Sequence, residues 1–271
     1  MADLVLVVGA TGGVGQLAVA KLLEKEIPVR VLTRNAEKAE KLFGDRVEAA
    51  IGDIRQPETL PPAMQGITHL ICATGTTAFP SARWQFDLPE AQGLQKLQQW
   101  RKIFLDKSYR NAHAKNSPQI VDADSVRHVV EAAPRDLQRF VFVSSCGVEH
   151  KTQFPYTVLN AFGVLDAKQQ GEAAIVQSGL PYTIIRPGQL IDGPFTSYDL
   201  NTLMKATTGG KKGITIGTGD TLSGQTSRID VAAACVESLH NPNAVNKIFE
   251  MVNKGNRPEA IDWSELFASI A

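Results

Sequence analysis

The 271-residue sequence has little cysteine, no excess of either charge and no long hydrophobic run. Its three cysteines, Cys72, Cys146 and Cys235, are far apart and form no Cys-x-x-Cys motif. This argues against a disulfide framework or a thiolate metal site and favours a reducing compartment. With 28 basic and 28 acidic residues the formal net charge is zero, so we do not expect a nucleic-acid partner.

Other absences narrow the class further. No stretch approaches the ~20 apolar residues that span a bilayer, so we expect no membrane span. The amino terminus has Asp3, no basic region and an apolar run that breaks at Gly9, which does not fit a signal peptide. The five histidines form no His-x-His or His-Glu-x-x-His group, so we expect no metal site. We expect a soluble, cytoplasmic monomer.

The sequence instead contains short apolar runs, rich in Val and Ile, that alternate with amphipathic stretches. The runs are bounded by Gly, Pro or charge and are typical of strands buried on both faces: Leu4–Val8, Val29–Leu32, Val47–Ile51, His69–Ala73, Phe140–Val143 and Tyr182–Ile185. Helical spacing predicts helices over Val14–Leu22, Ala36–Leu42, Ser125–Ala133 and Leu159–Ser178. The alternation predicts an α/β fold: one Rossmann-type domain, 1–271, with a doubly wound parallel sheet and helices on both faces.

Two segments break this alternation. Phe79–Ser117 is polar and aromatic-bearing, with helical spacing within Leu94–Leu105, and Gln189–Ser227 is rich in Gly and Thr. Long loops in a compact domain are usually functional. We therefore expect the two insertions to form a small lid over the carboxyl ends of the strands, where open α/β sheets bind ligands.

The strongest motif is VVGATGGVG at 7–15, where a strand passes through a glycine loop into a helix. Its glycines allow a tight turn, close approach of the backbone to a pyrophosphate, and close packing of helix on strand. The strand, helix and second strand follow at the spacing of a dinucleotide site. We predict cofactor contacts from the loop residues Gly9, Thr11, Gly12, Gly13, Val14 and Gly15.

The end of the second predicted strand indicates which dinucleotide binds. NAD sites usually have an acid there for the ribose 2′-hydroxyl, whereas this strand ends in Thr33, Arg34 and Asn35. Arg34 can pair with a 2′-phosphate, and its neighbours can donate to it. We predict that NADP(H) is preferred over NAD(H). The alternative is that Arg34 is a solvated residue that pairs with Glu37 or Glu40.

The next two strands end in further candidates. Asp53 could accept from an adenine amino group while Ile54 packs on the ring, although a loop or capping role for Asp53 fits the spacing equally well. Ala73, Thr74 and Gly75 are small residues where a cofactor backbone would pass. Alone, they indicate only a turn.

Together these motifs resemble the atypical short-chain dehydrogenase/reductase family, and within it the NAD(P)H-binding, NmrA-like branch with plant and cyanobacterial members, which is similar to flavin/biliverdin reductase B. The resemblance covers essentially the whole chain. It is carried by GATGGVG, LTR, GDI, CATG, VFVSSCGV, VLDAK and LPYTIIRPGQLI.

The resemblance implies catalytic residues, with one departure. Family members that reduce carbonyls use a Ser, a Tyr and a Lys, the last two one helical turn apart, with tyrosine passing the proton. Ser144, Ser145 and Lys168 match, but Val164 stands where the tyrosine belongs. The resemblance also implies that Pro187 and Gly188 contact the carboxamide.

Each of these roles has a structural alternative. Lys168 could be a solvated helix residue, and the serines could serve only turns. Tyr156 could replace the missing acid or be a packing residue.

Two functions remain open. The first is an NADPH-dependent oxidoreductase that passes hydride to a planar, conjugated small-molecule substrate such as a flavin, quinone or tetrapyrrole, for which solvent can supply the proton. The second is a non-catalytic NADP(H) redox sensor, or an assembly or scaffold protein with an unidentified protein partner. The missing tyrosine favours the second, whereas the glycine loop and Lys168 are compatible with both.

Overall fold

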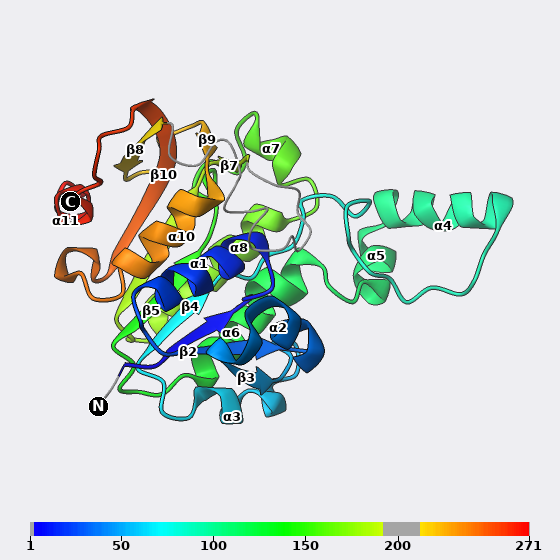
Figure 1. The fold of residues 1–271 in the computed structure, drawn as a ribbon. Helices are drawn as coiled ribbons and strands as arrows, with labels where there is room; N and C mark the ends of the chain where they lie inside the picture. Colours follow the sequence, from blue (N-terminus) through cyan, green and yellow to red (C-terminus); the bar gives the residue numbers. More distant parts are fainter. Residues whose placement is uncertain (1–2, 192–211, 271) are drawn as a thin grey trace.

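The central element of the fold is an eight-stranded sheet in the order β3-β2-β1-β4-β5-β6-β10-β8 (Figure 1). The computed structural model describes residues 3–191 and 212–270. Seven strands are parallel, and only β8 pairs antiparallel with its neighbour, β10. The strands are β1 (Val5–Val8), β2 (Val29–Thr33), β3 (Glu48–Ile51), β4 (His69–Cys72), β5 (Arg139–Val143), β6 (Tyr182–Pro187), β8 (Lys212–Gly217) and β10 (Lys247–Asn256).

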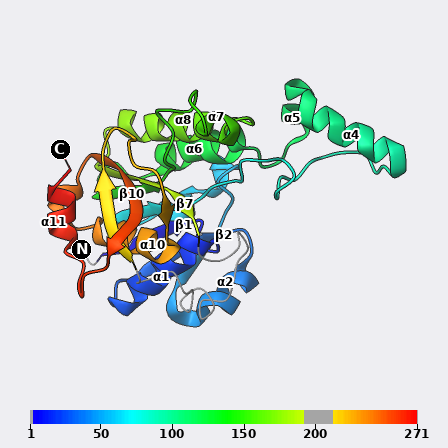
Figure 2. The ribbon, with the colours of Figure 1, turned by 90° about the horizontal axis from the view of Figure 1, so that it is seen from above.

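Helices cover both faces of this sheet, which confirms the predicted Rossmann-type arrangement (Figures 1 and 2). One face carries α1 (Gly13–Glu24), α2 (Ala36–Phe43), α10 (Arg228–Glu237) and α11 (Trp263–Ala268). The other carries α3 (Pro61–Met64), α6 (Ser125–Ala132) and α8 (Val164–Gln177). Successive residues of β1 enter opposite cores: Val5 and Val7 face the first layer, Leu6 and Val8 the second.

Shorter elements complete the chain. Turns of 3-10 helix lie at Gly44–Arg46, Pro57–Thr59 and Pro242–Ala244, and a turn of π-helix, η3 (Gln119–Asp124), runs directly into α6. The short strands β7 (Gln189–Leu190) and β9 (Gln225–Thr226) pair with each other. None of the described helices has both the length and the apolar character needed to cross a bilayer.

Several predicted boundaries were wrong. The single helix expected over Leu159–Ser178 is two helices, α7 (Tyr156–Leu159) and α8. They are separate because Gly163 has a left-handed φ of 82° and the Asn160 side chain accepts from the amides of Leu165 and Asp166, which starts a new helix.

Strand β3 also differs from expectation: its residues are largely exposed rather than buried on both faces, because it is the edge strand of the sheet. The sixth strand continues two residues beyond Ile185, and the strands after it were not predicted.

The first insertion, 79–117, forms an arm that projects from the sheet (Figures 1 and 2). It carries α4 (Gly93–Leu105) and α5 (Lys107–His113). Its two ends meet at an antiparallel bridge between Phe86 and Ala114. The second insertion, 189–227, is described only at its ends, since 192–211 lie outside the described residues. The lid function of both segments stays a prediction.

Candidate functional site

A cavity of about 640 Å³ opens at the carboxyl ends of β1, β2, β3 and β4. The strand order reverses between β1 and β4, and open α/β sheets bind ligands at this switch point. Eleven of the residues predicted to bind cofactor line the cavity: Gly9, Thr11, Gly12, Thr33, Arg34, Asn35, Asp53, Ile54, Ala73, Thr74 and Gly75. The fold therefore brings four separate strand ends into one site.

The glycine loop leaves room that side chains would fill. A Cβ on Gly9, whose φ is 82°, would lie 2.8 Å from the carbonyl carbon and oxygen of Ala73. A Cβ on Gly15 would lie 2.2 Å from the Gly9 carbonyl oxygen, so α1 could not approach the loop as closely. Gly12 is the N-cap residue of α1 and lines the cavity, placing the start of this twelve-residue helix beside it. These features fit the pyrophosphate of a dinucleotide.

Two other loop residues lie behind the cavity. A Cβ on Gly13 would come within 2.9 Å of the Arg228 side chain, which crosses from the start of α10. Val14 is buried in the core below the loop. These residues support the loop from behind.

The part of the cavity beside the end of β2, here called its outer end, is rich in basic side chains. Arg34 is exposed over 64% of its side chain and lies 3.9 Å from the Asp53 carboxylate. Asn35 caps α2 by accepting from the Lys38 amide at 2.9 Å, and its own amide donates to the Thr33 hydroxyl at 3.1 Å. The charged side chains that line the cavity are Arg34, Lys38, Asp53, Arg55 and Arg83. Cations outnumber acids here, as an additional phosphate requires.

Asp53 is already bound to protein groups. Arg55 contacts its carboxylate through Nε at 3.0 Å and Nη2 at 2.5 Å. Partial burial would raise the pKa of Asp53, but the hydrogen bonds from Arg55 outweigh burial and hold this pKa below its ordinary value. The carboxylate therefore pairs more closely with Arg55 than with Arg34, whose side chain stays largely exposed in the cavity.

Lys168 lies beneath the inner end of the cavity, and only 8% of its side chain is exposed. Its Nζ donates to the carbonyl of Thr74 at 3.1 Å and to that of Val143 at 2.9 Å. It also forms an ion pair with Asp122 at 2.9 Å. Lys168 is therefore not the solvated residue of the alternative interpretation, because three protein oxygens hold its ammonium between the ends of β4 and β5.

Sequence reasoning missed Asp122. Its side chain is fully buried in η3. Burial raises the pKa of this carboxyl, and the nearby Lys168 opposes that effect. Its second oxygen accepts from the Thr76 amide at 3.2 Å, which ties the pair to the cavity lining. A signal was present: Asp122 precedes the buried Val126 and Val129 by four and seven residues, so extending the predicted helix Ser125–Ala133 by one turn puts an acid on its apolar face.

The two serines follow β5 but face different surroundings. The Ser144 hydroxyl is buried and has no hydrogen-bond partner within the described part of the chain. The Ser145 hydroxyl is partly exposed and donates to the Cys146 carbonyl at 3.0 Å. Only Ser144 therefore offers a hydroxyl that the described residues leave unused.

The Pro187–Gly188 segment is satisfied internally. The Gly188 amide donates to the Met251 carbonyl at 3.0 Å and to the Thr226 hydroxyl at 2.9 Å. The Pro187 carbonyl accepts from the Cys146 amide at 3.0 Å. The backbone groups proposed for the carboxamide are thus engaged with neighbouring loops.

No phenol takes the place of the missing tyrosine in the described structure around Val164. This residue is buried in a small cluster with Val148 and Leu165, against which Tyr156 packs. The Tyr156 ring also lies over Gly147. Burial, reinforced by Cys146 and Asp220, raises the pKa of Tyr156, which makes it a weaker acid than a free tyrosine. The contacts favour the packing role.

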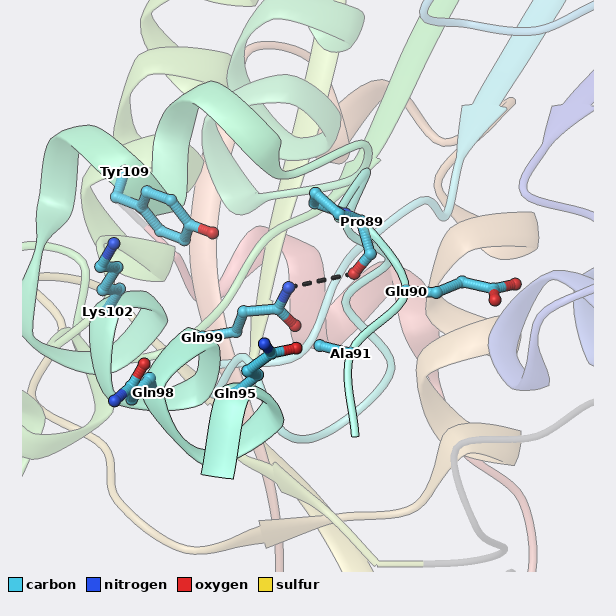
Figure 3. Close-up of a pocket in the computed structure, with 8 residues that line it drawn as sticks. All are labelled: Pro89, Glu90, Ala91, Gln95, Gln98, Gln99, Lys102 and Tyr109. Carbon is cyan, nitrogen blue, oxygen red and sulfur yellow. Dashed lines mark hydrogen bonds between the residues drawn. The ribbon is translucent and has the colours of Figure 1, made fainter. Parts of the chain in front are cut away.

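The arm contributes at both of its ends. At its base, Arg83 and Asn116 line the main cavity, although neither was predicted. Asn116 bridges the base by accepting from the Gln85 amide at 2.6 Å and donating to the Arg83 carbonyl at 3.1 Å. Further out, a polar hollow of about 260 Å³ lies between α4, α5 and the preceding loop, where Gln99 donates to the Pro89 carbonyl at 3.0 Å (Figure 3).

Known proteins share this architecture. Sanguinarine reductase of Eschscholzia californica is 30% identical over 98% of this chain and 95% of its own length. A photosystem II assembly factor of Trieres chinensis is 29% identical over 90% of this chain and 62% of its own length. Among solved structures, an anaerobilin reductase from Escherichia coli O157:H7 aligns with a TM-score of 0.64 at 21% identity, covering 94% of this chain and all of the other.

The family comparison agrees with the geometry of the loop and the cavity. The model described as NAD(P)H-binding matches residues 9–242, from the first glycine of the loop to beyond α10. The resemblance to the NmrA-like branch of atypical short-chain dehydrogenases/reductases is thereby confirmed. The chain belongs to the NAD(P)H-binding family.

Proposed function

We propose that the chain is an NADPH-dependent reductase that passes a hydride to a planar, conjugated acceptor of the flavin, quinone or tetrapyrrole type. The observation that carries this proposal is the combination of a fixed Lys168 with a buried valine one helical turn before it. The chain keeps a cation for positioning the cofactor but lacks the family's proton donor. A conjugated acceptor removes the need for that donor.

The proposed chemistry divides the work between the cofactor and the chain. When bound, the reduced nicotinamide supplies two electrons and one proton as hydride. The start of α1 would hold the pyrophosphate, and Arg34 would pair with the 2′-phosphate. Lys168 would hold the ribose on the nicotinamide side by turning one N–H from the Thr74 or Val143 carbonyl to a ribose hydroxyl, with Asp122 keeping the ammonium in place. Water supplies the second proton.

Relatives support both the proposal and its alternative. Sanguinarine reductase and anaerobilin reductase are named as reductases. Another relative is named as an assembly factor, which fits a non-catalytic NADP(H) sensor or scaffold with a protein partner. The missing tyrosine favours this alternative, whereas the glycine loop and Lys168 are compatible with both functions. A monomeric state and a cytoplasmic location stay predictions.

Turnover separates the two functions. The protein is mixed with NADPH and a panel of flavins, quinones and bilins, and oxidation is followed at the nicotinamide absorbance. We expect turnover with at least one acceptor, and a loss of at least about tenfold in Lys168→Ala, following roughly 1.4 kcal/mol or more for a lost charged hydrogen bond. The exposed Lys254 provides the matched control, Lys254→Ala. Tight NADPH binding with no turnover of any acceptor would instead support the sensor.

Cofactor preference tests the outer end of the cavity. We expect NADPH to bind more tightly than NADH, and Arg34→Ala to weaken NADPH binding by roughly ten- to a hundredfold while leaving NADH nearly unchanged. Arg135→Ala, which removes an exposed arginine away from the cavity, is the control. Equal affinities of the unaltered protein for the two cofactors in a fluorescence titration would contradict the assignment.

A further inference from the structure

The helix α4 exposes apolar side chains along one side. Leu94, Leu97 and Leu105 are exposed over 77%, 66% and 75% of their surface, and Phe104 over 40%. Their spacing of three, seven and one residues places them within about a third of the helix circumference. We call these four residues the exposed stripe.

Contacts cover one other side of α4 and one edge of the stripe, where the Phe104 ring lies 6.0 Å from that of Trp100 and 5.7 Å from that of Phe162 on the body. Ile103 is fully buried, and its carbonyl accepts from Arg110 of α5 at 2.8 Å. The polar side, with Gln95, Gln99 and Lys102, faces the hollow seen in Figure 3. The helix α4 projects from the body in two perpendicular views, which leaves room for a large partner beside the arm (Figures 1 and 2).

The charges on α4 itself have one sign, and Asp106 follows directly after Leu105. Lys96, Arg101 and Lys102 lie on α4, and residues 91–105 contain no Asp or Glu. Arg101 falls within the angular span of the stripe, while Lys96 and Lys102 lie on its two sides. The whole chain has zero net charge, so this concentration is a local feature of α4.

These charges indicate which kind of partner can bind the exposed stripe. A second copy of α4 would bring like charges together, with Arg101 at the centre of both apolar stripes, which disfavours pairing. A flat, anionic and apolar surface matches both the narrow stripe and its cationic flanks.

We propose that α4 is a peripheral membrane contact that lies on an anionic lipid surface. The three leucines would enter the boundary between headgroups and acyl chains, as in interfacial amphipathic helices, while Phe104 stays at the edge of the stripe beside Phe162. The stems of Lys96 and Arg101 would lie along the apolar side chains and place their charges among the headgroups. The cofactor site stays on the body, at the base of the arm.

Vesicle sedimentation tests this proposal with the full chain. We expect binding to vesicles of equal parts phosphatidylcholine and phosphatidylglycerol, weakening as salt is raised, and little binding to phosphatidylcholine alone. Leu94→Gln/Leu97→Gln/Leu105→Gln should abolish binding. Lys96→Gln/Arg101→Gln should weaken it about thirtyfold, since each basic residue near such a surface contributes about 1 kcal/mol.

The controls separate membrane contact from unfolding and self-association. Lys41→Gln/Lys254→Gln removes two exposed charges elsewhere and should bind vesicles like the unaltered chain. NADPH affinity of each arm variant reports whether the body is folded. Absence of sedimentation with the anionic vesicles overturns the proposal. A dimer in analytical ultracentrifugation that the leucine substitutions dissociate also overturns it, by assigning the stripe to a second copy.

Discussion

The Lys168 end of the cavity and the arm each break the usual rule that charges are exposed and apolar side chains are buried. At the first, Lys168 and Asp122 hold charges in a region almost closed to water. At the second, α4 leaves leucines in water. A buried ion pair is weak evidence for stability, since well-packed apolar residues often serve as well, and an exposed apolar patch usually marks an interaction site. Both exceptions therefore indicate a functional role rather than a contribution to stability. Substitutions at the two places should change the free energy of unfolding by very different amounts.

The largest effect on stability is expected from breaking the buried pair. Asp122→Ala should lower the free energy of unfolding by about 3–5 kcal/mol, because it leaves the Lys168 ammonium without its counter-charge. Asp122→Leu/Lys168→Met should recover most of this loss while removing the cation proposed for the cofactor. Urea unfolding of the three proteins measures the difference. A loss below about 1 kcal/mol for Asp122→Ala would mean that water or another group compensates the charge.

An intermediate effect on the free energy of unfolding is expected from His69, a buried histidine that stays neutral. Burial, together with the neighbouring His240, lowers the pKa of His69 to about 4. The unfolded chain binds this proton near pH 6.5, so the stabilising contribution is complete above pH 6.5 and is lost as pH falls toward 4.

The contribution should amount to about 2–3 kcal/mol. His69→Gln should remove this part of the pH dependence, whereas His150→Gln, which replaces a more exposed histidine, should retain it. Urea midpoints between pH 7 and pH 4 provide the measurement. Parallel curves for the unaltered chain and His69→Gln would rule out the assigned pKa.

The smallest effect is expected on the arm. Leu97→Gln should change the free energy of unfolding by no more than about 0.5 kcal/mol, because the side chain is already in water. The matched substitution Leu70→Gln, in the fully buried part of β4, should be severely destabilising. Thermal unfolding compares them. A large loss for Leu97→Gln would show that the stripe is covered in solution.

The same contrast explains what the sequence could predict. Strands β1, β4 and β5 were found because they contain continuous apolar runs, and β2 was found although Arg30 stands between Val29 and Val31. Strand β10 was missed because Glu250 interrupts its pattern. This carboxylate is buried and accepts from the backbone amides of Asp220, Thr221 and Leu222. These hydrogen bonds from a loop far away in sequence offset the free-energy cost of removing the carboxylate from water.

The candidate site likewise has a part that the sequence could predict and a part that it could not. The glycine loop and the strand ends are local motifs, and the structure gathers them into one cavity. The Lys168–Asp122 pair requires η3 to approach α8. That approach depends on Gly171, where a Cβ would lie 2.5 Å from the Asp122 carbonyl oxygen. A contact between two helices forty-six residues apart has no local signature.

The bridge at the base of the arm has a consequence for the assembly of the fold. The arm lengthens the connection between β4 and β5, which must close before these strands pair. Loop-closure entropy grows only logarithmically, by roughly 0.6 kcal/mol for each doubling of length. Because Phe86 and Ala114 meet at the base, the length of the outer segment adds little to this closure cost, although Phe104 and Arg110 still contact Phe162 of the body. Evolution could therefore lengthen, shorten or exchange the outer segment with little effect on the sheet, and membrane attachment could change while the dinucleotide pocket is preserved.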